Sequence, residues 1–131
     1  MKKAVYIKFE NDETVIGRWQ TIGVVDKKED YTPGKKILMR GAVSEMYFLP
    51  NGEEYGVWKT GWTKNLVKMA SNGGYLFCPY HIQEMDGELY MFLDTGEKAI
   101  LDSIYPKDNH DGIIVLKQAD KKRYTKNEIE A

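Results

Sequence analysis

Cys78 and His81 are residues whose types and spacing could hold a metal ion, because thiolate and imidazole are common zinc ligands. Apolar and aromatic side chains alternate through the surrounding residues 75–85, which predicts a strand. On a strand, side chains three residues apart point to opposite faces, so this pair cannot converge without a bulge. Cys78 is the only cysteine, and the other histidine, His110, lies in a distant predicted loop. We therefore interpret Cys78 as a small buried hydrophobic residue and predict no metal site and no cofactor.

Several acidic residues near predicted turns are candidates for acid–base chemistry or calcium binding: Asp94, Asp102, Asp108 and Asp111. The segment 108–112 reads Asp-Asn-His-Asp-Gly, which lacks the ligand spacing and the downstream glutamate of an EF-type loop. Turn formation explains these aspartates better. Two histidines, one cysteine and no Gly-x-Ser-x-Gly sequence provide no catalytic triad, and no glycine-rich loop precedes a predicted helix. We therefore predict that the protein is not an enzyme.

Aromatic side chains are spread over most of the predicted strands, and some of them must face the interior of any closed sheet. Ligand pockets are lined mainly by aromatic and aliphatic groups. The predicted ligand-binding candidates are Trp58, Trp62, Tyr80, Tyr90 and Phe92. The alternative, which we favour between the two, is that these rings fill a solid interior, because a small barrel can be packed without a cavity.

The elements that must position these residues are strands. Gly, Pro, Asn and Asp punctuate segments rich in β-branched and aromatic residues, and Asn51-Gly52 and Asp86-Gly87 are strong hairpin signals. No segment carries helical periodicity with caps. The predicted strands are residues 14–26, 43–49, 53–59, 62–69, 75–85, 88–94, 98–104 and 113–117.

Eight antiparallel strands in simple chain order predict an all-β fold, a single eight-stranded up-and-down antiparallel barrel, because closure removes exposed edges. A β-sandwich is the alternative architecture. We expect one domain over residues 1–131, with 1–13 as an N-terminal extension or extra edge strand (4–9) and 118–131 as a polar tail.

Composition excludes several classes of function. The chain has 131 residues, 42% hydrophobic and 30% charged, and 19 basic against 20 acidic side chains. This balance argues against nucleic-acid binding, which normally requires a basic surface. No apolar run approaches the roughly 20 residues that cross a bilayer, and residues 1–9 are too short and too charged for a secretory signal. A lone cysteine then favours a soluble, cytoplasmic protein.

An ordered series of motifs spans about residues 15–117: 15–19 (Val-Ile-Gly-Arg-Trp), 30–36 (Asp-Tyr-Thr-Pro-Gly-Lys-Lys), 45–52 (Glu-Met-Tyr-Phe-Leu-Pro-Asn-Gly), 61–64 (Gly-Trp-Thr-Lys), 90–92 (Tyr-Met-Phe) and 115–117 (Val-Leu-Lys). Together they resemble the small lipocalin-like (calycin-type) domains of Gram-positive bacteria, found alone or appended to membrane metallopeptidase regulators. The chain departs from that family at residues 93–100, where a Glu-Trp-Lys-Ser-Gly-Asp-Tyr run is usual. The resemblance implies a fold and a binding type of function, with no established activity.

The resemblance also implies a structural role for Gly17 and Trp19, which match the Gly-x-Trp signature of lipocalins. There, the tryptophan closes one end of the barrel, usually beneath an arginine from near the last strand. Arg123 is the only arginine after the predicted closing strand, with Lys117, Lys121 and Lys122 as less suitable substitutes because they lack a planar guanidinium.

Two functions remain open from the sequence. One is a non-enzymatic barrel that binds a small apolar or amphipathic ligand. The other is a solid structural or protein-interaction domain that acts through its surface or through an edge strand at residues 4–9. The size of the inward-facing side chains separates the two, and it depends on a strand register that one sequence does not fix.

Overall fold

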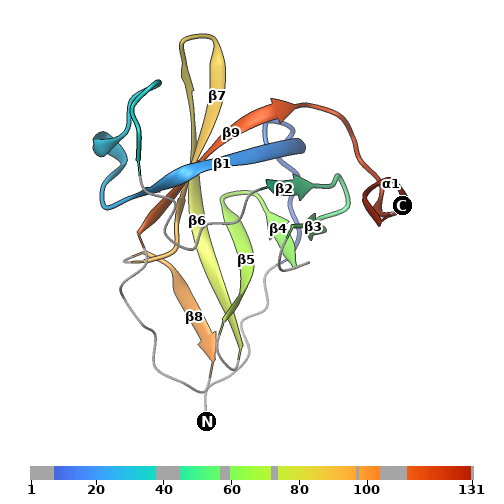
Figure 1. Ribbon diagram of the computed structural model, residues 1–131. Helices are drawn as coiled ribbons and strands as arrows, with labels where there is room; N and C mark the ends of the chain where they lie inside the picture. Colours follow the sequence, from blue (N-terminus) through green and yellow to red (C-terminus); the bar gives the residue numbers. More distant parts are fainter. Residues whose placement is uncertain are drawn as a thin grey trace.

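The computed structural model describes residues 8–37, 45–56, 60–71, 74–96, 98–103 and 112–130, and for residues 70, 71 and 101–103 it describes the backbone alone. Most of this chain is antiparallel sheet (Figure 1). The strands are β1 (Gly17–Val25), β2 (Glu45–Phe48), β3 (Glu54–Tyr55), β4 (Gly61–Thr63), β5 (Leu66–Ser71), β6 (Gly74–Met85), β7 (Glu88–Asp94), β8 (Ile100–Ser103) and β9 (Ile113–Asp120); a 3₁₀ turn, η1 (Lys28–Asp30), and a helix, α1 (Lys126–Glu130), complete the elements.

The strands form an eight-stranded up-and-down antiparallel barrel, as predicted. The hydrogen-bonded order is β3-β2-β1-β9-β7-β6-β5-β4. Strands β7 and β8 occupy one position in this order, because β7 pairs with residues 80–85 of β6 and β8 pairs with residues 74–77. Between β3 and β4 the ring is joined by the bridge of Glu53 with Gly61 and by the Glu54 N–H, which donates to the Thr60 carbonyl at 3.1 Å.

One predicted strand is wrong. Residues 62–69 do not form a single strand but a tight hairpin, β4–β5, in which Trp62 pairs with Val67 and Thr63 with Leu66. Asn65 makes the turn possible with a φ of 75°, a left-handed conformation that asparagine tolerates better than most residues. The sequence Lys64-Asn65 has no glycine, and therefore lacks the usual hairpin signal.

The Asn65 turn gives a first testable expectation. Asn65→Gly should leave the free energy of unfolding nearly unchanged, because glycine adopts this φ without strain. Asn65→Val should destabilise the protein by about 1–2 kcal/mol, because a β-branched residue is strained at positive φ. Urea unfolding of the two variants measures the difference. Equal stabilities would contradict the hairpin.

The other boundaries agree with the sequence in part. The turns at Asn51-Gly52 and Asp86-Gly87 connect strands as predicted, and both Asp86 and Gly87 have positive φ. Strand β9 extends through Asp120, three residues beyond the predicted end. Lys8 and Phe9 lie outside any strand, and residues 4–7 of the predicted edge strand lie outside the described residues.

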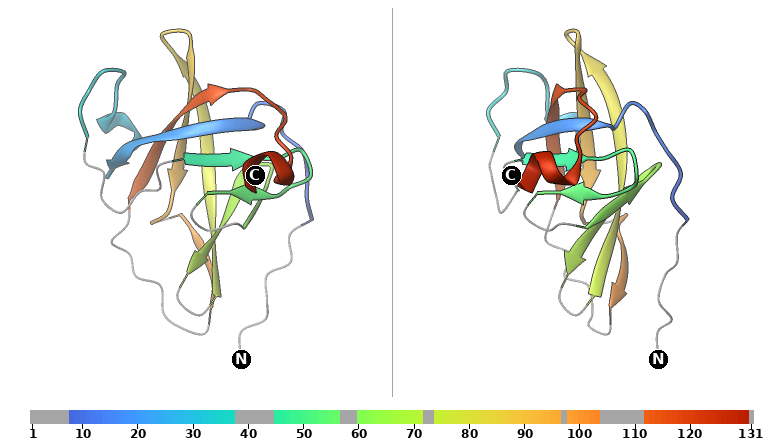
Figure 2. Two further views of the ribbon diagram at one scale, coloured as in Figure 1. Left: turned by 45° about the vertical axis from the view of Figure 1, so that its right-hand side comes forward. Right: turned by 90° about the vertical axis from the view of Figure 1, so that its right-hand side faces the viewer.

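A helix was not predicted, but α1 follows β9 in the polar tail. The Thr125 hydroxyl accepts the Glu128 N–H at 3.4 Å, and the Glu128 carboxylate accepts the Thr125 N–H at 3.2 Å. This reciprocal pair is a capping box, and the spacing of Thr125 and Glu128 is its signal in the sequence. In both views of Figure 2, α1 lies beside β2 and β3.

The barrel has two different ends. At the turn end, the short β2–β3 and β4–β5 turns meet residues 8–16, and the Glu10 N–H donates to the Thr63 hydroxyl at 2.6 Å. At the loop end, β1, β3, β5 and β8 finish, and their connections at 38–44, 57–59, 72–73 and 104–111 lie outside the described residues. A ligand entering the interior would have to pass one of these ends.

Two hydrophobic clusters lie on opposite faces of the sheet. The inner cluster lies inside the barrel and includes Trp19, Phe48, Trp62, Met91 and Leu116. The outer cluster lies where the segment after η1 covers β1, β7 and β9 from outside, and consists of Val25, Tyr31, Tyr90, Phe92 and Val115. The alternation along β7 separates them, since Met91 and Leu93 point inward while Tyr90 and Phe92 point outward.

Candidate ligand-binding site

Trp19 blocks the interior near the turn end. Its side chain is 0% exposed, and its indole Nε1–H donates to the carbonyl of Val15 at 2.8 Å. Gln118, its partner on β9, is also buried, and its side-chain amide donates to the Thr14 and Ile16 carbonyls at 3.3 Å. The polar edge of the Trp19 ring and the main-chain carbonyls of residues 14–16 beside it therefore all have hydrogen-bond partners.

Gly17 is required beside Trp19 because β9 passes too close for a side chain. A Cβ at this position would lie 2.2 Å from the Asp120 carbonyl oxygen, and the φ of 134° strains any other residue. Arg123 is the candidate for the arginine that the resemblance places over Trp19, but its ion pair is made elsewhere. Arg123 pairs with Glu13 at the surface, 2.9 Å away.

An acidic residue that the sequence did not single out lies inside the barrel. Glu54 on β3 pairs with the inward-facing Phe48 and is only 1% exposed. Its Oε1 accepts the Thr60 hydroxyl at 3.0 Å, while its Oε2 has no hydrogen-bond partner among the described residues. Buried carboxyl oxygens normally have partners, so a solitary one marks a candidate site.

The environment of Glu54 changes its protonation. Burial raises the pKa of its carboxyl from 4.5 to about 7, and the hydrogen bonds from Thr60 oppose the rise only in part. Near neutral pH the group is therefore poised between an acid that donates and a carboxylate that accepts. The Thr60 hydroxyl also contacts the Lys68 carbonyl, which fixes it between β3 and β5.

Gly56 leaves room for the Glu54 carboxyl. A Cβ on Gly56 would lie 2.9 Å from Oε2 and 2.7 Å from the Glu45 carbonyl oxygen. A second unpartnered polar atom lies on the same wall, formed by strands β1 to β3. Thr21 on β1 pairs with the inward-facing Leu116, and its buried Oγ1 has no hydrogen-bond partner in the described parts of the chain.

The described side chains of this half of the barrel are aliphatic or small. Met46 and Met69, on the strands next to β3 and β4, are 0% and 4% exposed. Further inner-cluster residues here are Val24, Ala99 and Ile114, with half-buried Leu76 packed against them. The large rings of Trp19, Phe48 and Trp62 lie toward the turn end. Glu54 lies at the boundary between the aromatic and the aliphatic parts of the interior, because its cross-strand partner is Phe48.

The five ligand-binding candidates from the sequence do not form one site. Trp62 faces the interior, donates its Nε1–H to the Leu49 carbonyl at 2.8 Å and packs edge-to-face on Phe48. Tyr80 also packs against the inner cluster. Tyr90 and Phe92 lie in the outer cluster beside Tyr31, with ring centroids 5.6 and 6.4 Å away. Trp58 lies outside the described residues.

Tyr80 makes a partly buried polar contact at the turn end. Its hydroxyl donates to Asp12 Oδ2 at 2.6 Å, and its main-chain N–H donates to the Asn65 carbonyl at 3.1 Å. Burial and this bond raise the pKa of the Tyr80 phenol. Burial alone would raise the pKa of Asp12, but bonds from Tyr80 and Thr14 lower it overall. Tyr80 thus ties residues 8–16 to β6.

Of the remaining residues considered for chemistry, the structure describes the side chains of Cys78, His81 and Asp94. Cys78 faces the interior, with its sulfur 3.7 Å from that of Met69, while His81 is exposed. The Asp94 carboxylate accepts the Gly96 N–H at 3.0 Å, which is a turn role. The side chains of Asp102, Asp108 and Asp111 lie outside the described residues.

An outer cleft of about 860 Å³ lies between η1 and β6–β7. Its walls mix charges of both signs, with Lys27, Lys28 and Lys98 against Asp26, Glu29 and Asp94. Two of the predicted ligand-binding candidates, Tyr80 and Phe92, also line this cleft. Because its walls carry both signs of charge, the cleft does not select a ligand of one charge.

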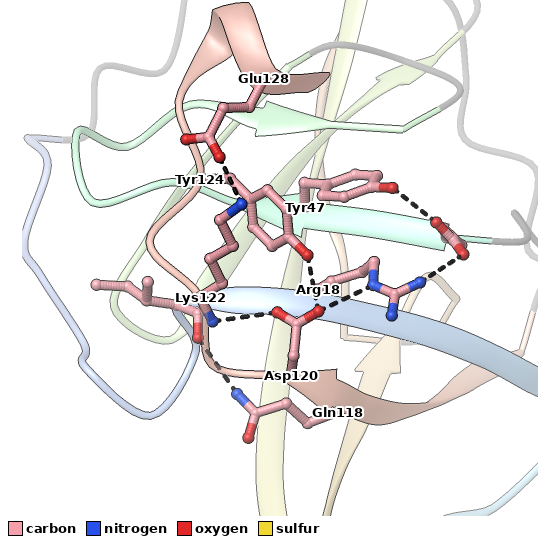
Figure 3. A network of polar contacts seen from close by, with 9 residues as sticks. Arg18, Tyr47, Gln118, Asp120, Lys122, Tyr124 and Glu128 are labelled. Carbon is pink, nitrogen blue, oxygen red and sulfur yellow. Dashed lines mark hydrogen bonds and ion pairs between the residues drawn. The ribbon is translucent and has the colours of Figure 1, made fainter. Parts of the chain in front are cut away.

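A polar network ties the C-terminal segment to the outside of the barrel (Figure 3). Arg18 on β1 bridges Asp120 at 3.1 Å and Glu45 at 3.2 Å. The Tyr124 hydroxyl donates to Asp120 at 2.7 Å, and its ring packs edge-to-face on Tyr47, 5.0 Å between centroids. The network is structural, because every group in it already has a partner.

No protein-family model, no curated protein and no solved structure matches this chain. None of the helices in the described ranges has the length and apolar character needed to cross a membrane. The site therefore rests on its own geometry.

Proposed function

We propose that the protein is a small-molecule binding barrel without a catalytic step, and that it holds an amphipathic ligand in the half of its interior that contains Glu54. The observation that carries the proposal is the unpartnered Oε2 of Glu54, a buried carboxyl on the inward-facing side of β3. A ligand with one polar group would satisfy that oxygen and place its apolar body against Met46 and Met69. The resemblance to small lipocalin-like domains supports the same type of function.

The change in side-chain character along the interior also supports binding at this half. Trp19, Phe48 and Trp62 are large, rigid and satisfied at their polar edges. Methionines are flexible and adapt to a ligand's shape. A barrel of eight strands has room for one small ligand.

Filling this half of the interior tests the proposal. Ala99 belongs to the inner cluster, and Ala119 on β9 is exposed, so Ala99→Phe and Ala119→Phe make the same change inside and outside the barrel. Titration calorimetry with 1-octanol and octylamine should show one site on the wild type and on Ala119→Phe. The Ala99→Phe variant should bind at least about tenfold more weakly, because the added ring occupies the ligand's volume.

Circular dichroism of each variant verifies that the barrel is intact. Failure of the wild type to bind either probe would contradict the proposed function, and so would equal affinities for the two phenylalanine variants.

A further inference from the structure

The unpartnered Glu54 oxygen also indicates which polar group the barrel accepts, and this inference rests on the proposed function. We propose that the group bound at Glu54 is a protonated primary amine, the polar end of a small aliphatic amine. The carboxyl can accept two kinds of donor, a neutral hydroxyl or a cationic ammonium, and the surroundings of Glu54 favour the cation.

The first support is the absence of a compensating positive charge in the described structure around Glu54. On β5, Lys68 points outward, with its ammonium 3.9 Å above the Tyr75 ring. On β2, Glu45 faces outward to Arg18, and Glu53, which precedes β3, accepts the Tyr55 hydroxyl on the outer face. Within the described structure, the hydrogen bonds of the Glu54 side chain are to Thr60, which is neutral. A cation from the ligand would supply the missing charge.

The second support is that folding has already removed this carboxyl from water. The desolvation of an acid is normally what makes a buried ion pair weak, but at Glu54 it is part of the free protein. A bound ammonium then gains a charge-assisted hydrogen bond, which is shorter and stronger than a neutral one. A hydroxyl gains only the neutral bond, and a carboxylate ligand would place two acids together.

The third support is the shape of the polar group's surroundings. Oε1 already accepts one hydrogen bond, from Thr60, so the ligand needs to serve only Oε2. The inward-facing residues beside Glu54 on β2, its pairing partner Phe48 and the preceding inward residue Met46, are apolar. A compact group with its charge at the end of an apolar chain matches this arrangement, whereas a guanidinium is larger, planar and carries five donors instead of three.

Three probes of equal chain length test the inference: octylamine, 1-octanol and octanoate, each titrated below its micelle concentration at pH 8. We expect octylamine to bind about ten- to a hundredfold more tightly than octanol, the difference between a charged and a neutral hydrogen bond. Octanoate should bind most weakly. Equal affinities for amine and alcohol would overturn the amine inference and leave the binding function standing, whereas no binding of any probe would overturn the binding function.

The pH dependence gives a second readout that needs no variant. Since the pKa of Glu54 is about 7, roughly half of the carboxyls are protonated at neutral pH. Octylamine affinity should therefore rise roughly tenfold from pH 6 to pH 8, as the fraction of carboxylate rises. Binding at pH 7 should release on the order of half a proton, seen as a dependence of the calorimetric heat on the buffer. Octanol binding should release none, and equal release with both probes would contradict the inference.

Glu54→Gln and its neighbour Glu53→Gln form the matched pair of variants. The first removes the inner carboxyl and keeps its size, and the second does the same on the outer face. Glu54→Gln should lose the preference for amine over alcohol, and Glu53→Gln should keep it. Loss in both variants would assign the preference to surface charge and overturn the inference. If Glu54→Gln fails to fold, the pH and proton-release measurements on the wild type still decide.

Discussion

Trp19→Ala is expected to lower the free energy of unfolding by about 3–5 kcal/mol. The ring is fully buried in the inner cluster, and its Nε1–H is the only donor that the structure shows for the Val15 carbonyl in this buried corner. Removing it leaves both a cavity and an unsatisfied carbonyl. For a domain whose total stability is about 5–15 kcal/mol, that is a large loss.

Urea unfolding followed by far-UV circular dichroism measures this loss without relying on tryptophan emission. Trp19→Phe is the matched control, because it keeps most of the packing and removes the hydrogen bond, so it should cost less than Trp19→Ala. If Trp19 contacted a ligand and did not stabilise the fold, Trp19→Ala would abolish octylamine binding while its unfolding midpoint stayed near that of the wild type. That result would contradict the structural role.

The second large effect is a loss of stability with rising pH that depends on Glu54. Its pKa is about 7 in the folded protein and 4.5 in the unfolded chain, so the folded state holds the extra proton between these values. Stability therefore falls as pH rises through this range and levels off above it. Between pH 5 and pH 8, the wild type should lose about 2–3 kcal/mol relative to Glu54→Gln.

Comparing the two proteins cancels the other titrations. Asp12, Glu13, Glu53, Asp120 and Glu128 have lowered pKa values and act in the opposite direction, at more acidic pH. Urea midpoints at several pH values give the difference, and Glu53→Gln should follow the wild type. Parallel curves for the wild type and Glu54→Gln would contradict a buried, uncompensated carboxyl.

Much of the fold could be predicted because local turn chemistry determines it. Asp86-Gly87 and Asn51-Gly52 fixed two hairpins, and the alternation beyond them fixed antiparallel order. The predicted number of eight barrel positions is correct because two differences cancel. Residues 62–69 form two strands instead of one, on either side of the Asn65 turn, while β7 and β8 share one position along β6. The pairing of strands that are distant in the sequence determines the eight positions of the barrel, and the local pattern alone does not show this pairing.

The site was harder to predict, for two physical reasons. Both faces of β7 are buried, so its pattern is apolar throughout and could not show that Tyr90 and Phe92 face outward. Glu54 breaks the expected alternation, since a charged residue in a core is rare. Counting across the Asn51-Gly52 turn from Phe48 would have placed it inside, because Phe48 pairs with Glu54.

The central claim is that a small amine occupies the interior beside Glu54, and methionine methyl NMR tests it most directly. Met46 and Met69 lie inside the barrel near Glu54, while Met85 packs against the outer cluster. With ¹³C-methyl methionine, saturating octylamine should shift the Met46 and Met69 signals and give contacts from them to the alkyl chain, and leave Met85 unchanged. Unchanged Met46 and Met69 signals at saturation, or a shift confined to Met85, would contradict the claim.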